Sequence, residues 1–88
     1  MDTLATLEQA ILLAQRFGYQ VRQEWLDGAG GGHCQIGGQR TLFLDLSQDA
    51  IEQLDRVLVA LQSYPGLDAI AKLLSPEMAN LVSGRRAA

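Results

Sequence analysis

The chain has 88 residues, of which 48% are apolar and 19% are charged, so it fits one globular domain and falls outside the composition typical of disorder. Seven basic and ten acidic residues give a net charge of −3, and the basic residues are scattered, which argues against nucleic-acid binding. We expect neither a membrane span nor an export signal, because the chain has no long apolar stretch and no basic segment at its start.

Cys34 is the only cysteine and His33 the only histidine. A single thiol forms no internal disulfide, and these two side chains cannot by themselves hold a structural zinc ion. We therefore expect a cytoplasmic protein without metal or cofactor. Because so short a chain buries a small share of its surface, a partner subunit is the remaining way to add stability.

The first expected element is a helix over residues 2–17. Its apolar side chains recur at steps of three and four residues, and Asp2 or Thr3 is a suitable N-cap. Gly18 follows as a helix stop.

A half-buried strand is expected next, over residues 19–26, where aromatic and β-branched side chains alternate with polar ones. Tyr19 and Trp25 fall on one face of this strand. Two interpretations stay open for this aromatic pair: a binding platform on an open sheet face, or packing beneath the helices.

Residues 33–36 and 40–46 are two further strand candidates, and Gly37 and Gly38 between them are a hairpin turn signal. Three consecutive strands with short connections predict an antiparallel meander. The last of them carries leucines on one side and Phe43 on the other, so we expect it to be central or covered on both faces.

The hairpin register depends on the length of the turn, because paired residues share a face of the sheet. A two-residue turn pairs Cys34 with Thr41, whereas a three-residue turn pairs Cys34 with Leu42. The three-residue turn gathers the cleaner apolar face, and the sequence leaves both registers open. In either register we expect Cys34 to be a buried, unreactive thiol.

The strongest helix is expected after Ser47, its N-cap, and ends before Pro65. Residues 67–74 predict a short helix, and Ser75 begins another that Gly84 stops. The fold class is therefore α+β, with an N-terminal helix, a three-stranded antiparallel meander, a long helix and one or two short C-terminal helices. We expect a single domain over residues 1–84 and a frayed tail over residues 85–88.

Glycines at positions 28 and 30–32 suggest a loop whose backbone N–H groups could hold an anion. The nucleotide-binding glycine motifs need a helix directly after the glycines, whereas here a strand follows. We therefore favour a structural loop, and keep a ligand-binding loop of Gly30, Gly31, Gly32 and His33 as the alternative.

Two other groupings of polar residues have simpler structural interpretations. His33 and Cys34 are neighbours in a strand, so their side chains point to opposite faces and make a poor catalytic pair. The acidic residues of the second half lack the glycine and terminal glutamate of a calcium loop, and helix capping and solubility explain them: Asp45, Asp49, Glu52 and Asp55.

Residues 24–36, which read EWLDGAGGGHCQI, are followed by LFLDL at residues 42–46 and EQL at residues 52–54. This pattern resembles that of a family of short bacterial conserved hypothetical proteins. The resemblance covers the middle half of the chain, and it implies no activity and carries no functional residue across.

The leading hypothesis is a non-enzymatic interaction module that self-associates, because the predicted sheet has more apolar surface than the helices of one copy can cover. A homodimer packed through the sheet, with Trp25, Phe43 and Tyr19 at the interface, would cover it. The alternative is a protein that binds a small molecule or an anion through residues 28–32 and His33.

Overall fold

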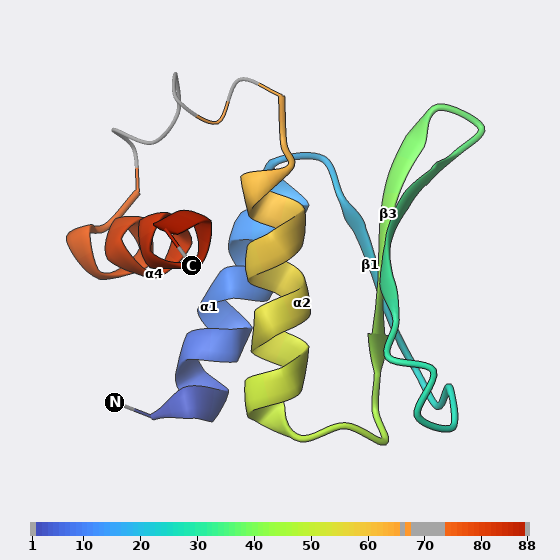
Figure 1. Ribbon diagram of the computed structural model, residues 1–88. Helices are drawn as coiled ribbons and strands as arrows, with labels where there is room; N and C mark the ends of the chain where they lie inside the picture. Colours follow the sequence, from blue (N-terminus) through green and yellow to red (C-terminus); the bar gives the residue numbers. More distant parts are fainter. Residues whose placement is uncertain (1, 66, 68–73, 88) are drawn as a thin grey trace.

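The computed structural model describes residues 2–65, 67 and 74–87, and it confirms the α+β class. An N-terminal helix is followed by three strands and then by helices (Figure 1). The described elements are α1 (Thr3–Arg16), β1 (Gln20–Glu24), β2 (Gly32–Ile36), β3 (Gln39–Asp45), α2 (Ala50–Gln62) and α4 (Pro76–Ala87).

The sheet is mixed, with the strand order β1-β3-β2, so the predicted antiparallel meander is wrong. β3 lies in the centre, parallel to β1 and antiparallel to β2. The connection after β1 crosses the end of β3 because Asp45, the last residue of β3, accepts hydrogen bonds from the N–H groups of Leu26 and Gly30. These hydrogen bonds lead the chain past β3, so that β2 lies on the side of β3 opposite to β1.

Of the two registers that the sequence leaves open, the hairpin of β2 and β3 adopts the one with the two-residue turn, although the three-residue turn would gather the cleaner apolar face. Cys34 pairs with Thr41, and Ile36 pairs with Gln39. Gly37 and Gly38 have φ values of +56° and +81°, which match a type I′ turn that suits the twist of the strands. Turn geometry therefore decided the register over the apolar pattern.

Helices α1 and α2 lie side by side against one face of the sheet, which we call the helix-covered face (Figure 1). Strand alternation and the observed register place Val21, Gln23, His33, Gln35, Arg40, Leu42 and Leu44 on this face. Leu42 and Leu44 are fully buried there, in a core completed by Leu7, Ala10, Ala14, Tyr19, Val57, Leu58, Ala60, Leu61, Leu67, Met78 and Val82.

The opposite face, which we call the open face, has no helix over it in the described part of the chain (Figure 1). It carries residues of all three strands: Gln20, Arg22, Glu24, Gly32, Cys34, Ile36, Gln39, Thr41, Phe43 and Asp45.

Side-chain caps define where the two long helices begin. Asp2 caps α1 by accepting from the Leu4 N–H at 3.1 Å. The N-cap of α2 is Asp49, which accepts from the Glu52 N–H at 2.9 Å, so the prediction of Ser47 as this cap is wrong. Ser47 instead donates its hydroxyl to Asp45 at 2.7 Å, a stronger, charge-assisted partner.

Helix α4 begins as predicted, with the Ser75 hydroxyl accepting from the Met78 N–H at 3.1 Å. It packs on the end of α2, where Gln62 donates to the Val82 carbonyl at 2.7 Å. The helix runs through Gly84 to residue 87, so the predicted stop is wrong: a single glycine weakens a helix but does not by itself end it. The short helix predicted at residues 67–74 lies, apart from its two ends, outside the described residues.

Candidate functional site

Tyr19 belongs to the core of a single copy. It is 5% exposed, and its hydroxyl donates to the Ala60 carbonyl of α2 at 2.9 Å. Burial raises the pKa of the Tyr19 phenol, and the nearby Arg40 opposes that change. The predicted interface residue Tyr19 therefore packs beneath the helices, where a partner has no access to it.

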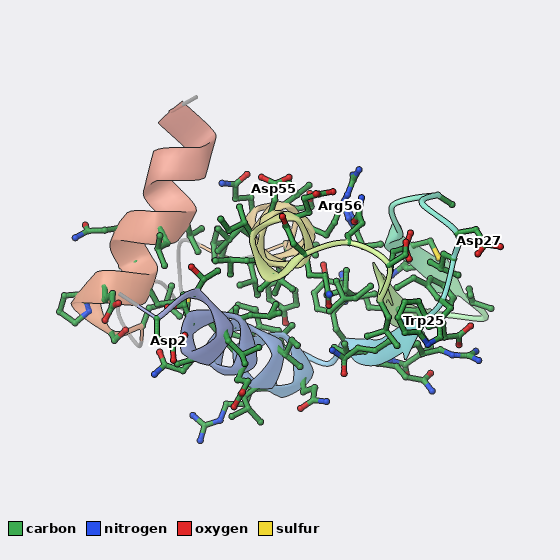
Figure 2. The ribbon with its side chains drawn as sticks, turned by 90° about the horizontal axis from the view of Figure 1, so that it is seen from below. Asp2, Trp25, Asp27, Asp55 and Arg56 are labelled. Carbon is green, nitrogen blue, oxygen red and sulfur yellow. The ribbon has the colours of Figure 1, made fainter. Side chains whose placement is uncertain are left out.

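Trp25 and Phe43 are accessible. Trp25, just beyond the end of β1, is 73% exposed and lies on the sheet side of the molecule (Figure 2). Phe43 is half-buried on the open face, and the Arg22 guanidinium lies 5.6 Å from the centre of its ring. Tyr19 and Trp25, which were predicted to share one face, therefore have different environments: Tyr19 packs in the core, and Trp25 is exposed to solvent.

The loop from β1 to β2 is organised by the carboxylate of Asp45, which is fully buried. One carboxylate oxygen accepts from the N–H groups of Leu26 at 3.1 Å and Ser47 at 2.9 Å, and the other from the Gly30 N–H at 3.1 Å. Ser47 also joins Gly28 to the network, since its hydroxyl oxygen accepts from the Gly28 N–H at 3.0 Å. The hydroxyl of Ser47 makes the largest contribution to holding the pKa of Asp45 well below its usual range, and burial opposes it.

Gly31 sits so close to β3 that a side chain would not fit. Its φ is +68°, and a Cβ atom at this position would overlap the carbonyl oxygen of Phe43. The neighbouring Gly30, with a φ of +90°, would bring a Cβ to 3.2 Å from the Arg56 guanidinium of α2 (Figure 2). The glycines thus let the loop pack between β3 and α2 while Asp45 binds its N–H groups.

The four residues of the predicted ligand loop do not gather around one cavity: Gly31 and Gly32 line a hollow on the open face, whereas Gly30 and His33 do not. The Gly30 N–H is buried against Asp45, Gly31 lies on the backbone of β3, and His33 belongs to the helix-covered face. Because a carboxylate of the chain already occupies the Gly30 donor, an anion would have to displace it. This geometry favours the structural interpretation of the glycines over a ligand-binding one.

A hollow of about 330 Å³ lies on the open face beside the glycine loop. Its lining is mostly apolar and comes from the loop, β2 and β3: Leu26, Ala29, Gly31, Gly32, Cys34 and Phe43. Cys34 is exposed, so the prediction of a buried thiol is wrong; the two-residue register puts its side chain on the face that the helices leave uncovered. Ile36, two residues further along β2, is 56% exposed.

A second hollow, of about 260 Å³, lies on the helix-covered side of β2. His33 and Arg40 are among its lining residues, and the Arg40 guanidinium lies 5.0 Å from the centre of the Tyr64 ring. The remaining lining residues are Tyr19, Cys34, Gln35, Ser63 and Pro65. This hollow leaves space beside β2 between the sheet edge and the end of α2.

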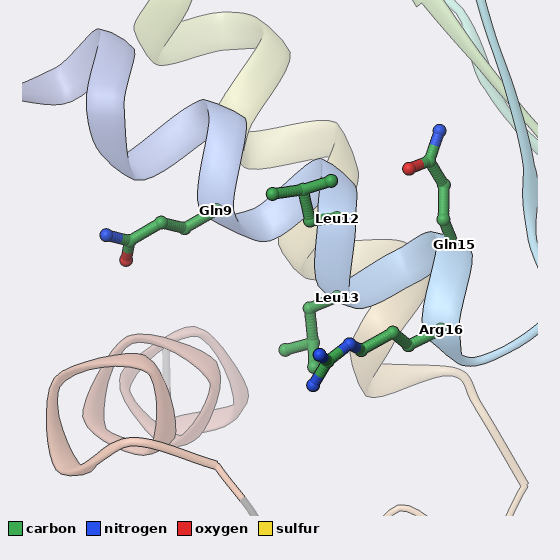
Figure 3. Close-up of a pocket in the computed structure, with 5 residues that line it drawn as sticks. All are labelled: Gln9, Leu12, Leu13, Gln15 and Arg16. Atoms are coloured by element: carbon green, nitrogen blue, oxygen red, sulfur yellow. The ribbon is translucent and has the colours of Figure 1, made fainter.

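Helix α1 also exposes apolar side chains that the helical pattern assigned to its buried stripe. Leu4 is 56% and Leu12 is 61% exposed. A groove of about 480 Å³ runs along this helix, lined by Gln9, Leu12, Leu13, Gln15 and Arg16 (Figure 3). Apolar side chains are therefore exposed on α1 as well as on the open face, and the open face adjoins the outer edge of β2.

Sequence reasoning missed two features of this region. Asp45 was grouped with the acidic residues that cap helices and add solubility, although a Ser two positions later is a local signal for an Asp side chain that binds backbone N–H groups. Ile36 was treated only as part of a hairpin face. Its exposure follows from the two-residue register, which places it on the open face.

Comparison with protein-family models, with curated proteins and with solved structures finds no match to this chain. Among the residues that the structure describes, no three His, Cys, Asp or Glu side chains gather to form a candidate metal site. None of the described helices is both long and apolar enough to cross a membrane.

Proposed function

We propose that this protein is a non-enzymatic interaction module that forms a homodimer through its sheet. One observation carries the proposal: α1 and α2 both lie on one face of the sheet, while the open face has an exposed Ile36, a half-buried Phe43 and a mostly apolar hollow. Apolar surface gathered in this way on a small domain is typical of a protein interface.

Three further arguments concern the cellular compartment, the kind of partner and the size of the assembly. The exposed, unpaired thiol of Cys34 suits a reducing compartment, so we place the protein in the bacterial cytoplasm. The net charge of −3 disfavours a nucleic-acid partner. A closed two-fold dimer would bury the same patch on both copies, which limits the assembly through this patch to two chains.

The test is the molar mass of the purified full chain by light scattering over low to high micromolar concentrations. We expect a monomer–dimer equilibrium that Phe43→Gln shifts strongly towards the monomer. The control variants Leu12→Gln and Ile51→Gln replace apolar residues that are 61% and 66% exposed on the helices, and they should leave the equilibrium unchanged. A monomer at every concentration, or a dimer that only Leu12→Gln disrupts, would overturn the proposal.

The alternative prediction, an anion or small-molecule site at the glycine loop, has less support because Asp45 already binds the Gly30 N–H. It predicts that nucleotides or phosphorylated metabolites raise the melting temperature of the protein. A thermal shift screen measures this directly.

A further inference from the structure

The two outer strands of the sheet differ in how well their free edges are protected against pairing with another chain. β1 carries Arg22 and Glu24, whose side chains form an ion pair at 2.7 Å. β2 reads GHCQI, without Asp, Glu, Lys, Arg or Pro, and residues 33–36 are all exposed. Edge strands of monomers usually carry charges, proline or bulges that prevent pairing, so β2 is an unprotected edge.

The backbone groups that β2 presents outward follow from its register with β3. In a hairpin closed by a two-residue turn, the residues that flank the turn form a hydrogen-bonded pair, and such pairs alternate with non-bonded ones. Gly32, Cys34 and Ile36 therefore direct their N–H and C=O groups towards β3. Those of His33 and Gln35 point away from the sheet, and no described strand pairs with them.

This arrangement is self-complementary. If two β2 strands run antiparallel about a two-fold axis at Cys34, His33 of each copy lies opposite Gln35 of the other. Each of these two pairs exchanges two hydrogen bonds, so all four outward groups of each strand find partners. A shift of the axis to His33 or Gln35 would leave part of them unpaired.

The side chains fit the same axis. The pairing puts Ile36 of one copy opposite Gly32 of the other, on the open face. Gly32 has no side chain and lines the 330 Å³ hollow beside Phe43, so the Ile36 side chain of the second copy has an apolar space to enter. On the helix-covered face, the hollow lined by His33 and Gln35 leaves room for side chains of the second copy between the edge of β2 and the end of α2.

We infer that two copies of this chain pair through the outer edges of β2, antiparallel about Cys34, to form one continuous six-stranded sheet in which each Ile36 fills the hollow of its partner. This inference rests on the proposed homodimer and specifies its geometry.

Cys34 reports directly on this geometry. At the two-fold axis, the Cys34 residues of the two copies lie opposite each other as a non-hydrogen-bonded pair. The Cα atoms of such a pair are about 4.5 Å apart, which falls within the range of about 4.4 to 6.8 Å that a disulfide spans. The thiol is exposed on the open face. Added diamide, which takes two electrons and two protons from the thiol pair, should therefore convert the dimer rapidly into a covalent dimer.

The matched control moves the thiol to another exposed position of the open face. In the double variant Cys34→Ser, Gln20→Cys the thiol lies on β1, across the sheet from the β2 edge. We expect diamide to cross-link this variant at least about tenfold more slowly than the natural chain, because its two thiols stay apart in the dimer. Equal rates would contradict the proposed axis.

Substitutions at the edge test the pairing without a thiol. Gln35→Pro removes an N–H that points to solvent in one copy and leaves the bonds between β2 and β3 in place, so the monomer should fold. Its dimer dissociation constant should rise at least about 100-fold. The proline of each copy removes one hydrogen bond between the two β2 strands, and its ring obstructs their close approach. Gln35→Thr keeps the N–H and should leave dimerisation nearly unchanged.

Ile36→Glu should weaken the dimer about 100-fold, because two buried isoleucines are lost, whereas Ile51→Glu on α2 should have no effect. The outcomes separate the two proposals. A chain that stays monomeric overturns both. A dimer that resists diamide cross-linking and tolerates Gln35→Pro and Ile36→Glu overturns edge pairing alone and leaves another sheet-mediated dimer standing.

Discussion

The two faces of the sheet are stabilised in different ways, although they alternate along the same strands. On the helix-covered face, Leu42 and Leu44 are fully buried against α1 and α2. On the open face, the two buried residues are polar: Thr41, and Asp45, whose carboxylate is covered by backbone groups of the glycine loop. One face depends on apolar packing within a single copy, and the other combines a polar network at one end with uncovered apolar groups.

This difference explains how a chain of 88 residues leaves apolar groups of its sheet uncovered. Both long helices lie on the same face of the sheet. The glycine loop covers the end of the open face through hydrogen bonds, and Ile36 and Phe43 at the hairpin stay accessible. The following substitutions test each part of the comparison.

Asp45→Asn should cause the largest loss of stability. The amide keeps one acceptor oxygen and turns its N–H₂ group towards donors that now bind the other, so at least one N–H group of the network would lose its partner. We expect the lowest urea midpoint of the set, with proteolysis at the glycine loop. A urea midpoint and a cleavage rate like those of the natural chain would show that the network does not hold the loop.

The same carboxylate makes stability depend on pH. Its pKa is lower in the folded than in the unfolded chain, so its stabilising effect is complete above the unfolded value of about 4 and is lost as the pH falls towards the folded value. Urea midpoints at pH 6 and pH 3 should therefore differ more for the natural chain than for Asp45→Asn. Equal differences would contradict this origin.

Leu44→Ala should destabilise the monomer by about 3 to 4 kcal/mol, because it opens a cavity in a fully buried site. Phe43→Ala, one residue away on the open face, should cost only about 1 to 2 kcal/mol in the monomer despite the larger side chain, since Phe43 is half-buried there. Urea unfolding at nanomolar protein, where the proposed dimer should be dissociated, measures both losses of stability. Similar losses would remove the contrast between the faces.

Gly31→Ala should cost about 3 kcal/mol, because its positive φ disfavours a side chain and the Phe43 carbonyl occupies the space. The matched variant Gly28→Ala has a similar φ of +83° with no atom within 4 Å of the added carbon, so it should lose only about 1 kcal/mol. The two unfolding free energies separate backbone strain from close packing. A Gly28→Ala loss as large as that of Gly31→Ala would assign the whole effect to strain.

Tyr19→Phe should have the smallest effect, about 1 kcal/mol. It removes the hydrogen bond to the Ala60 carbonyl and keeps the ring in the core. Because Tyr19 is buried on the helix-covered face, the variant should dimerise like the natural chain. A weakened dimer with unchanged monomer stability would instead indicate that Tyr19 lies in the dimer interface.

Much of the secondary structure follows from local sequence. The apolar periodicity of α1 and α2, the Asp2 and Ser75 caps and the glycine pair of the hairpin act within a few residues of each other, so the element order and the α+β class were predictable. Ser47 and Asp49 are both good N-caps by composition. The choice between them depended on Asp45, which binds Ser47.

The strand order, the role of Asp45 and the exposure of Cys34 were decided by contacts between distant parts of the chain. Asp45 accepts hydrogen bonds from Leu26 and Gly30, which are 19 and 15 residues away. A pattern of hydrophobicity does not predict such hydrogen bonds. Apolar alternation shows that two faces of a strand differ, but not which face the helices cover. The sequence alone thus determined which elements form, because their causes are local, and only the tertiary structure decided their arrangement and which apolar surface stays uncovered.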